Sequence, residues 1–334
     1  MKSPVTGNEM TLTKEKRSME FRRETFDIIF HYFQCAESGE QFTSTALDEV
    51  NMNQVCNKYR EKFNIPFPEE IKRIREKYGL PAAKMSEILG FGINSYRQYE
   101  TGDVPAAANA KLIQMAEAPE NFIDMIDTCV SLSDDLKKKY IRKAKSLIED
   151  RKQNIFQSNY MEYIMGGHMA DLYSGYRTPN LEKYTDMVVY FAHRLQPFKT
   201  KMNKLLFYAD FLSFRNTCFS ISGIKYRAIE MGPVPQNFQG LYEFLYNNDE
   251  IEISTTWFPQ GYTGEKFMTR KERPFNPRLF SEPELKVLED IATRFQSTSA
   301  TDIVKHSHRE KAWLKNEKTR SLISYEYAFE MEPL

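Results

Sequence analysis

The segment 68–128 constrains the fold most, because apolar residues at helical spacing recur there in short stretches separated by breakers. The breakers contain Gly79, Gly90 and Gly102, each within three residues of a proline or another glycine. The stretches between them predict five helices, which are Glu69–Tyr78, Ala82–Leu89, Asn94–Thr101, Ala106–Glu117 and Pro119–Cys129. Short helices joined by tight turns predict a small helical bundle.

Two of these helices and the turn between them have the lengths of a helix-turn-helix. The turn is Gly90–Phe91–Gly92, and the helix after it is the one that lies in the DNA major groove in such folds, with its first residues facing base edges. Asn and Gln amides bond adenine in two places, and Arg bonds guanine in the same way. The predicted base contacts are Ile93, Asn94, Arg97 and Gln98, and the predicted phosphate contacts are Lys84 and Ser95.

The charge of the chain does not decide between DNA binding and an ordinary helical bundle. Lys plus Arg and Asp plus Glu both number 46 in the 334 residues, so the net charge is zero. The segment Pro68–Glu117 is also balanced, with seven residues of each sign. Composition therefore leaves both interpretations open, and any DNA contact depends on a local surface.

The run IREKYGLPAAKMSEILGFGINSYRQYETGDVP resembles the helix-turn-helix of the lambda-repressor/XRE family, and more specifically the C-terminal half of MqsA-type antitoxins. In that family an asparagine and an arginine four positions later read the operator. Asn94 matches the asparagine, whereas Gln98 stands in place of the arginine and Arg97 precedes it. The resemblance implies a homodimer that binds palindromic operator DNA. Because Gln98 replaces the family's arginine, the preferred operator sequence should differ from that of the family.

The first 66 residues predict a β-ribbon domain followed by a connecting helix. Met10–Lys14 and Ser18–Phe21 are predicted as short strands on either side of a charged turn, and Thr25–Phe33 as an aromatic strand. Ser44 or Thr45 is predicted to cap a helix over Ala46–Phe63.

The opening MKSPVTGNEM resembles the zinc-binding start of MqsA-type antitoxins, MKCPxCG, with the cysteines replaced. Ser3 and Thr6 stand at the first ligand pair, and Cys35 and Ser38 at the second. Because hydroxyls do not supply thiolate charge, these residues predict a zinc-ribbon fold without metal or cofactor. A β-ribbon unrelated to zinc proteins is the alternative, and the neighbouring His31 is predicted to be structural.

The remainder of the chain predicts a helical linker over 131–180 and a mixed domain over 181–334. Ser133 is predicted to cap a helix over Asp134–Ile155, and Gly166–Pro179 to connect to the last domain. Further predicted helices are Glu182–Leu195, Lys199–Phe214, Gln236–Tyr246, Pro283–Phe295, Ala300–Ser307 and Glu310–Asn316, and predicted strands are Ile251–Phe258 and Glu265–Arg270. The segment Gly232–Pro233–Val234–Pro235 is predicted to be a rigid turn.

Four segments of this last part resemble the Panacea (SocA-like) family: KMNKLLFYADF, GIKYRAIEMGPVP, TDIVKHSHREKAW and LISYEYAFE. The resemblance implies an antitoxin domain that neutralises a cognate toxin by direct binding, or, in one branch of the family, an adaptor that delivers the toxin to a protease. His306, His308 and Glu310 are the candidates for chemistry, but histidines at a helix end also satisfy carbonyls, and Trp313 is predicted to be core. We therefore predict no enzyme.

The sequence as a whole predicts a mainly α, multidomain protein: a small N-terminal β-ribbon, a five-helix XRE-type helix-turn-helix over 67–130 and a C-terminal α+β Panacea domain. Scattered cysteines and the lack of a signal pattern or a long apolar run predict a cytoplasmic protein with no membrane contact. The predicted function is the antitoxin of a type II toxin–antitoxin system that represses its own operon as a dimer. The alternatives are a ligand-sensing regulator, a protease adaptor and an enzyme with a DNA-targeting domain.

Overall fold

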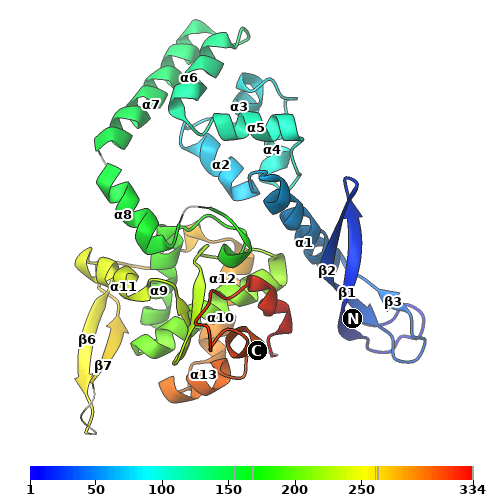
Figure 1. Ribbon diagram of the computed structural model, residues 1–334, viewed down its shortest axis with the longest axis vertical. Coiled ribbons are helices and arrows are strands. Elements are labelled where there is room, and N and C mark those ends of the chain that lie inside the picture. The colour runs from blue at the N-terminus through cyan, green and yellow to red at the C-terminus, as the bar shows by residue number, and fades with distance from the viewer. Residues whose placement is uncertain (154, 168, 260, 262, 333–334) are drawn as a thin grey trace. The chain divides into compact units, whose positions relative to one another are not determined.

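The computed structural model of the chain describes residues 1–153, 155–167, 169–259, 261 and 263–332. The chain is mostly helical, with small antiparallel sheets, and it divides into two compact units, Met1–Tyr160 and Met161–Leu334 (Figure 1). The predicted mainly α, multidomain class is therefore confirmed. Within the described residues, no helix combines the length and the apolar character that crossing a membrane requires.

The first unit opens with a long β-ribbon. β1 (Thr11–Phe21) pairs along its whole length with β2 (Glu24–Gln34), and β3 (Gln41–Phe42) pairs with the end of β2. The predicted charged turn between Lys14 and Ser18 was wrong. The charged residues there belong to a continuous strand and alternate between its two faces, and the Arg17 guanidinium stacks over Phe30 at 4.1 Å from the ring centroid.

Helix α1 (Thr45–Phe63) covers the outer edge of β2 with side-chain amides. Ser44 is its N-cap, as predicted. The amide of Asn51 accepts from the N–H of His31 (2.8 Å) and donates to its C=O (3.0 Å). Gln54 bonds the backbone of Ile29 in the same two ways, at 2.9 and 2.8 Å. These amides satisfy peptide groups that another strand would otherwise pair with.

Six further helices complete the first unit. They are α2 (Pro68–Glu76), α3 (Ala82–Ile88), α4 (Ser95–Glu100), α5 (Ala107–Met115), α6 (Pro119–Thr128) and α7 (Asp134–Gln153), each within a few residues of its prediction. Their apolar faces share one core, to which α2 contributes Ile71, α3 Met85, α4 Tyr96 and α7 both Tyr140 and Ala144. Helix α7 is therefore packed on the bundle. Helix α8 (Ile155–Met165) follows, and its last residues belong to the second unit.

Two arginines join the ribbon and α1 to the helical bundle. Arg60 of α1 is fully buried and donates to the C=O of Gly102 (2.6 Å) and to Asn57 Oδ1 (3.0 Å). Arg22, in the turn between β1 and β2, donates to the C=O groups of Val104 and Pro105. Burial lowers the pKa of Arg60 to about 10. Both guanidiniums thus bond the loop between α4 and α5.

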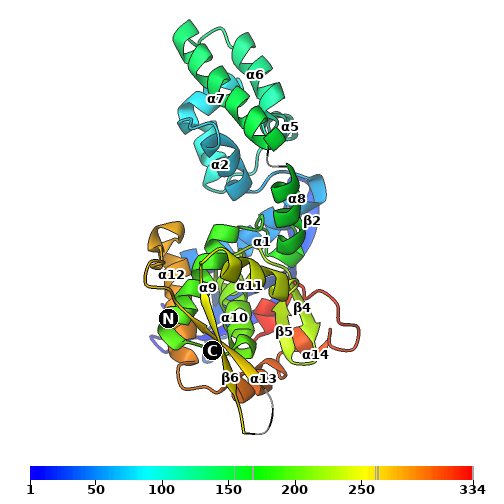
Figure 2. The same cartoon turned by 90° about the vertical axis from the view of Figure 1, so that its left-hand side faces the viewer.

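The second unit is built around α10 (Lys199–Thr217), which is buried over most of its length (Figure 2). Around it lie α9 (Leu181–Leu195), α11 (Phe238–Asn247), α12 (Glu282–Arg294), α13 (Ala300–Ser307) and α14 (Lys311–Leu314), with short 3₁₀ turns at Leu172–Ser174, Pro277–Leu279 and Tyr325–Glu330. Two hairpins complete it: β4 (Tyr226–Ile229) with β5 (Gly232–Pro235), and β6 (Glu252–Trp257) with β7 (Thr263–Met268).

The segment Gly232–Pro235, predicted as a rigid turn, is strand β5, and that prediction was wrong. It pairs with β4 from Ile229 opposite Gly232 to Tyr226 opposite Pro235. A two-stranded hairpin tolerates two prolines because only one side of each strand has to pair. Gly232 is required for space, since a Cβ there would lie 2.5 Å from Ser307 Oγ and 2.6 Å from Lys204 Cε.

Part of the segment predicted as a linker packs into the second unit. Ser174 is buried, and its C=O accepts from Ser220 Oγ at 2.7 Å. The next residue, Gly175, accepts through its C=O from the N–H of Ser220, and a Cβ on Gly175 would lie 2.6 Å from Ser220 Cβ. This close backbone approach explains the glycine at position 175.

Candidate functional site

Helices α3 and α4 and the turn between them are fixed by hydrogen bonds of two buried side chains. Ser86 Oγ of α3 accepts from the N–H of Tyr96 at 3.0 Å, and Tyr96 OH donates to the C=O of Ile71 in α2 at 2.8 Å. Gly90 adopts a φ of 71°, which L residues rarely adopt, and so allows the chain to reverse after α3. The start of α4 is therefore held in one orientation.

The four predicted base contacts lie exposed at the start of α4. Ile93 is 74% exposed, and Asn94, Arg97 and Gln98 are exposed beside it. Asn94 is the N-cap residue of α4 but makes no capping hydrogen bond with its side chain, so its amide faces solvent. The structure thus brings together the side chains that sequence reasoning assigned to base recognition.

The two predicted phosphate contacts, Lys84 and Ser95, are less exposed to a ligand than the predicted base contacts, each for a different reason. Lys84 Nζ lies 2.7 Å from the carboxylate of Glu87, one turn later on α3, and hydrogen bonding to that carboxylate raises the pKa of Lys84. Ser95 is half-buried against the turn, and its Oγ would lie 3.1 Å from a Cβ at Gly92. Both residues adjoin α4, but Lys84 already has an acidic partner.

A basic face on α7 is one feature of this unit that sequence reasoning missed. The sequence has no acidic residue between Leu136 and Ile148. Five exposed cations lie in that stretch: Lys138, Lys139, Arg142, Lys143 and Lys145. Tyr140 and Ala144, on the opposite side of α7, belong to the core shared with α3 and α4. The signal was present in the run KKKYIRKAK, where cations recur at spacings of three and four residues.

The positions that resemble zinc ligands come together at one end of the β-ribbon. Ser3 Oγ accepts from the N–H groups of Val5 and Thr6, and Thr6 Oγ1 lies 3.3 Å from Cys35 Sγ. Hydrogen bonds from Ser38 and Thr6 lower the pKa of the Cys35 thiol to about 6. One thiol and three hydroxyls do not form a zinc site, because hydroxyls lack the donor charge that the metal needs. Instead, Ser3 bonds backbone N–H groups, and Thr6 and Ser38 form hydrogen bonds with Cys35.

Among the described residues, no three His, Cys, Asp or Glu side chains come together in a way that could hold a metal ion.

The candidates for chemistry in the second unit have separate partners. The His308 ring stacks on Trp313 at 3.8 Å between centroids, whereas Glu310 accepts from Tyr208 OH at 3.4 Å. His306 contacts the ring of Phe295. Burial raises the pKa of Glu310 to about 7. Trp313 is buried, as predicted, and its indole N–H donates to the C=O of Ile229 at 2.8 Å. The side chains of His306, His308 and Glu310 therefore do not converge on one another.

A buried carboxylate, Asp210, anchors the centre of the second unit. It accepts from the N–H groups of Ile221 and Ser222 at 2.8 Å, from the Ser222 hydroxyl at 2.5 Å and from Tyr226 OH at 2.8 Å. Burial raises the pKa of Asp210, while these donors oppose the rise. A carboxylate with four donors holds α10 to the segment leading into β4, and so has a structural explanation.

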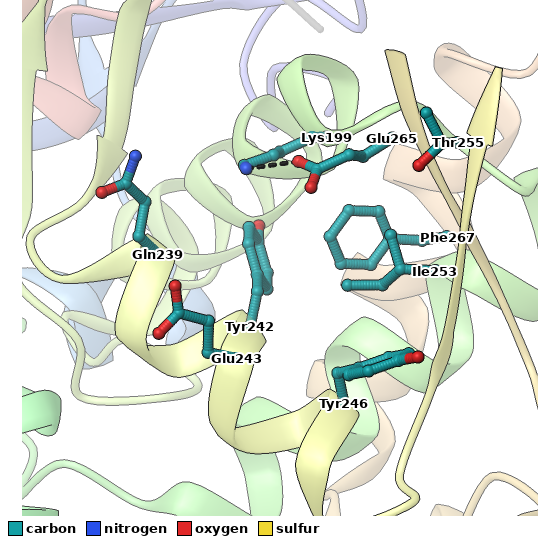
Figure 3. A pocket seen from close by; sticks show the side chains of 9 residues that line it. All are labelled: Lys199, Gln239, Tyr242, Glu243, Tyr246, Ile253, Thr255, Glu265 and Phe267. Atoms are coloured by element: carbon teal, nitrogen blue, oxygen red, sulfur yellow. Dashed lines mark hydrogen bonds and ion pairs between the residues drawn. The ribbon is translucent and has the colours of Figure 1, made fainter. Parts of the chain in front are cut away.

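A pocket of about 400 Å³ lies between α11 and the β6–β7 hairpin (Figure 3). Its floor is aromatic, with the rings of Tyr242 and Phe267 edge to face at 4.6 Å. Glu243 on α11 and the ion pair between Lys199 and Glu265 line it from different elements. The remaining lining residues are Gln239, Tyr246, Ile253 and Thr255.

Two parts of the chain are similar to antitoxin families of toxin–antitoxin systems. Residues 1–127 match the family described as the antitoxin component of bacterial toxin–antitoxin system, MqsA. Residues 202–314 match the family described as antitoxin SocA-like, Panacea domain. The chain thus combines an MqsA-like antitoxin domain with a SocA-like Panacea domain, as the sequence motifs predicted. No curated protein matches the chain.

Proposed function

We propose that the protein is the antitoxin of a type II toxin–antitoxin system, that its second unit neutralises a cognate toxin by direct binding, and that its first unit represses the operon as a DNA-binding dimer. The observation that carries this proposal is the occurrence of two independent antitoxin families in one chain, at 1–127 and 202–314. A ligand-sensing regulator or an enzyme would not require both.

Direct binding, rather than chemistry, is supported by the side chains of the second unit. Its ionisable residues have structural partners: Asp210 accepts four hydrogen bonds, and Glu310 and His308 contact different aromatic rings. A catalytic site would need a nucleophile or base aimed at a shared point in a cleft. The unit offers instead a preformed pocket with exposed side chains around it.

DNA binding is supported by the exposed start of α4 and by the basic face of α7. Asn94, Arg97 and Gln98 have the chemistry that reads adenine and guanine edges, and α4 is fixed on its scaffold by Tyr96. The cations on α7 face solvent on a helix that shares the same core. They would contact the phosphate backbone, which contributes affinity without reading sequence.

The proposal is tested by purifying the full-length protein together with the product of the neighbouring open reading frame, and by measuring a reporter fused to the shared promoter. We expect a stable complex, and we expect reporter repression that is lost in Asn94→Ala with Gln98→Ala. A protein that represses the reporter but forms no complex with the neighbour would favour the ligand-sensing regulator. A protein that does neither would refute both halves of the proposal.

The dimer is tested with the same purified protein. Light scattering after size-exclusion chromatography should give twice the chain mass of 39.3 kDa. A mass that stays at one chain at micromolar concentration would contradict dimeric repression.

A further inference from the structure

The β6–β7 hairpin has one covered edge and one free edge. On the covered edge, the N–H of Phe267 in β7 donates to the C=O of Pro197 at 2.9 Å, and Phe198 pairs with Lys266. Among the described residues, nothing forms a backbone hydrogen bond to the outer edge of β6. An uncovered strand edge is a template for pairing with another chain.

The direction of the peptide groups on β6 follows from the bond of Phe267. Since the N–H of Phe267 points away from β6, its pairing with Ile253 is of the non-hydrogen-bonded kind. Thr255, two residues on and opposite Glu265, is paired in the same way. The N–H and C=O groups of Ile253 and Thr255 therefore point outward, where an added strand would bond them.

The same residues present their side chains to the pocket. Ile253, Thr255 and Trp257 alternate along β6 and lie on one face of the hairpin. Across the pocket, α11 presents Gln239, Tyr242, Glu243 and Tyr246, which share one helix face (Figure 3). We call the space between these two faces, together with the outer edge of β6, the β6 groove.

The floor of the β6 groove is rigid and its rim is exposed. Tyr242 OH donates to Asn203 Oδ1 of α10 at 2.7 Å, which fixes the ring in the floor. Trp257 is 78% exposed and Tyr246 46% exposed. Large exposed aromatic side chains beside a formed pocket are typical of a protein-binding surface rather than of a solvated one.

The charge of the β6 groove selects the partner's side chain. Glu243 is exposed and forms no ion pair in the described part of the chain, and Glu265 lies across the pocket, paired with Lys199. A carboxylate without a partner favours a cation, and Tyr246 and Trp257 add aromatic faces that attract guanidinium and ammonium groups. An acidic or purely apolar segment would leave Glu243 uncompensated.

We propose that the β6 groove is the toxin-binding surface: an extended segment of the toxin pairs with the outer edge of β6 and presents an arginine or lysine to Glu243. This inference rests on the proposed antitoxin function and specifies its binding site. The backbone bonds supply affinity, and the pocket selects the side chain, as in other cases of strand addition.

Hydrogen exchange of the full-length protein, with and without the purified product of the neighbouring open reading frame, tests the backbone part. The amides of Ile253 and Thr255 should exchange at least tenfold more slowly in the complex, because each gains a hydrogen bond. The inference is overturned if a complex forms and exchange at both amides is unchanged.

Variants test the side-chain part. Glu243→Arg and Trp257→Ala should each raise the Kd for the same partner at least tenfold, and Thr255→Pro should do so by removing an outward N–H. Glu252→Arg is the matched control, because Glu252 is exposed on the other face of the same strand. Circular dichroism and the unfolding midpoint identify any variant that fails to fold, and Glu243→Gln then serves as the milder change.

The outcomes separate the two proposals. Wild-type protein that does not bind the neighbour refutes the antitoxin function itself. If the wild type binds the neighbour and the Kd is unchanged in Glu243→Arg, Trp257→Ala and Glu252→Arg, only the assignment of the β6 groove as the binding surface is refuted. A partner in which reversal of one arginine or lysine to glutamate restores binding to Glu243→Arg would identify the paired residue.

Discussion

Removing three cations from α7 should weaken DNA binding in a manner that depends on salt. The variant is Lys138→Gln with Arg142→Gln and Lys145→Gln, three positions that face away from the core. All three side chains are exposed, so their replacement by glutamine removes charge without opening the packed side of the helix. The expected change is in affinity for any duplex, because phosphates carry no sequence information.

The magnitude follows from counterion release. The proposed dimer carries these three cations twice, and each phosphate contact contributes about 0.9 to the slope of log affinity against log salt, so the six contacts contribute about 5.4. Over the fourfold range from about 50 to 200 mM salt, wild-type affinity should therefore fall about 1,800-fold more than that of the variant.

The assay is fluorescence anisotropy with a labelled duplex from the protein's own promoter, titrated at four salt concentrations. The matched control is Lys286→Gln with Lys315→Gln and Lys318→Gln, which removes the same charge from exposed positions of the second unit. If the slope of log affinity against log salt is the same for the wild type, the α7 variant and the control, α7 does not contact the phosphate backbone of the DNA.

Three further predictions concern recognition and stability. Asn94→Ala should lose about 1–3 kcal/mol of preference for operator over random duplex without a change in salt slope, measured by competition; an unchanged preference would remove Asn94 from base reading. Asn51→Ala should lower the free energy of unfolding by about 1–3 kcal/mol, because it leaves the buried N–H and C=O of His31 without hydrogen-bond partners. Met52→Ala, at an exposed neighbouring position, should not lower it. Burial lowers the pKa of Lys204 to about 7. Between about pH 7 and 10 the Lys204 amine is therefore neutral in the folded chain and protonated in the unfolded chain. Because the unfolded state binds more protons, the free energy of unfolding of the wild type should rise with pH by up to about 1.4 kcal/mol per unit. Lys204→Met should lack this rise in urea unfolding at pH 7 and 9, and parallel curves would contradict the assignment.

The helices of the first unit were predictable because their signals are local. Gly79, Gly90 and Gly102 end α2, α3 and α4, and each adopts the positive φ that favours glycine. Arg97, predicted as a base contact, is exposed, and its neighbour Tyr96 is buried in the core. Such signals need no knowledge of the rest of the chain.

Apart from the basic face of α7, whose signal is local, the features that sequence reasoning missed depend on contacts distant in sequence. In the sequence, Asn51 and Gln54 do not differ from other polar residues of a helix. Only their hydrogen bonds to the backbone of β2 show that they cover the edge of that strand. Gly232–Pro235 reads as a turn by composition, but its pairing with Tyr226–Ile229 makes it a strand. The β6 groove combines α11 with a hairpin, and no local pattern predicts that two such faces meet.

Neutralisation of a toxin by this protein is tested most directly by cell growth. The product of the neighbouring open reading frame is expressed alone, with the full-length protein, and with its Glu243→Arg variant, while the amount of that product is followed by immunoblot. We expect growth to stop when the neighbouring product is expressed alone and to be restored by the wild-type protein while the amount of toxin stays unchanged. The Glu243→Arg variant should restore growth poorly. Restored growth with a falling amount of toxin would replace direct neutralisation by delivery to a protease, and the absence of rescue at confirmed expression would contradict the antitoxin function.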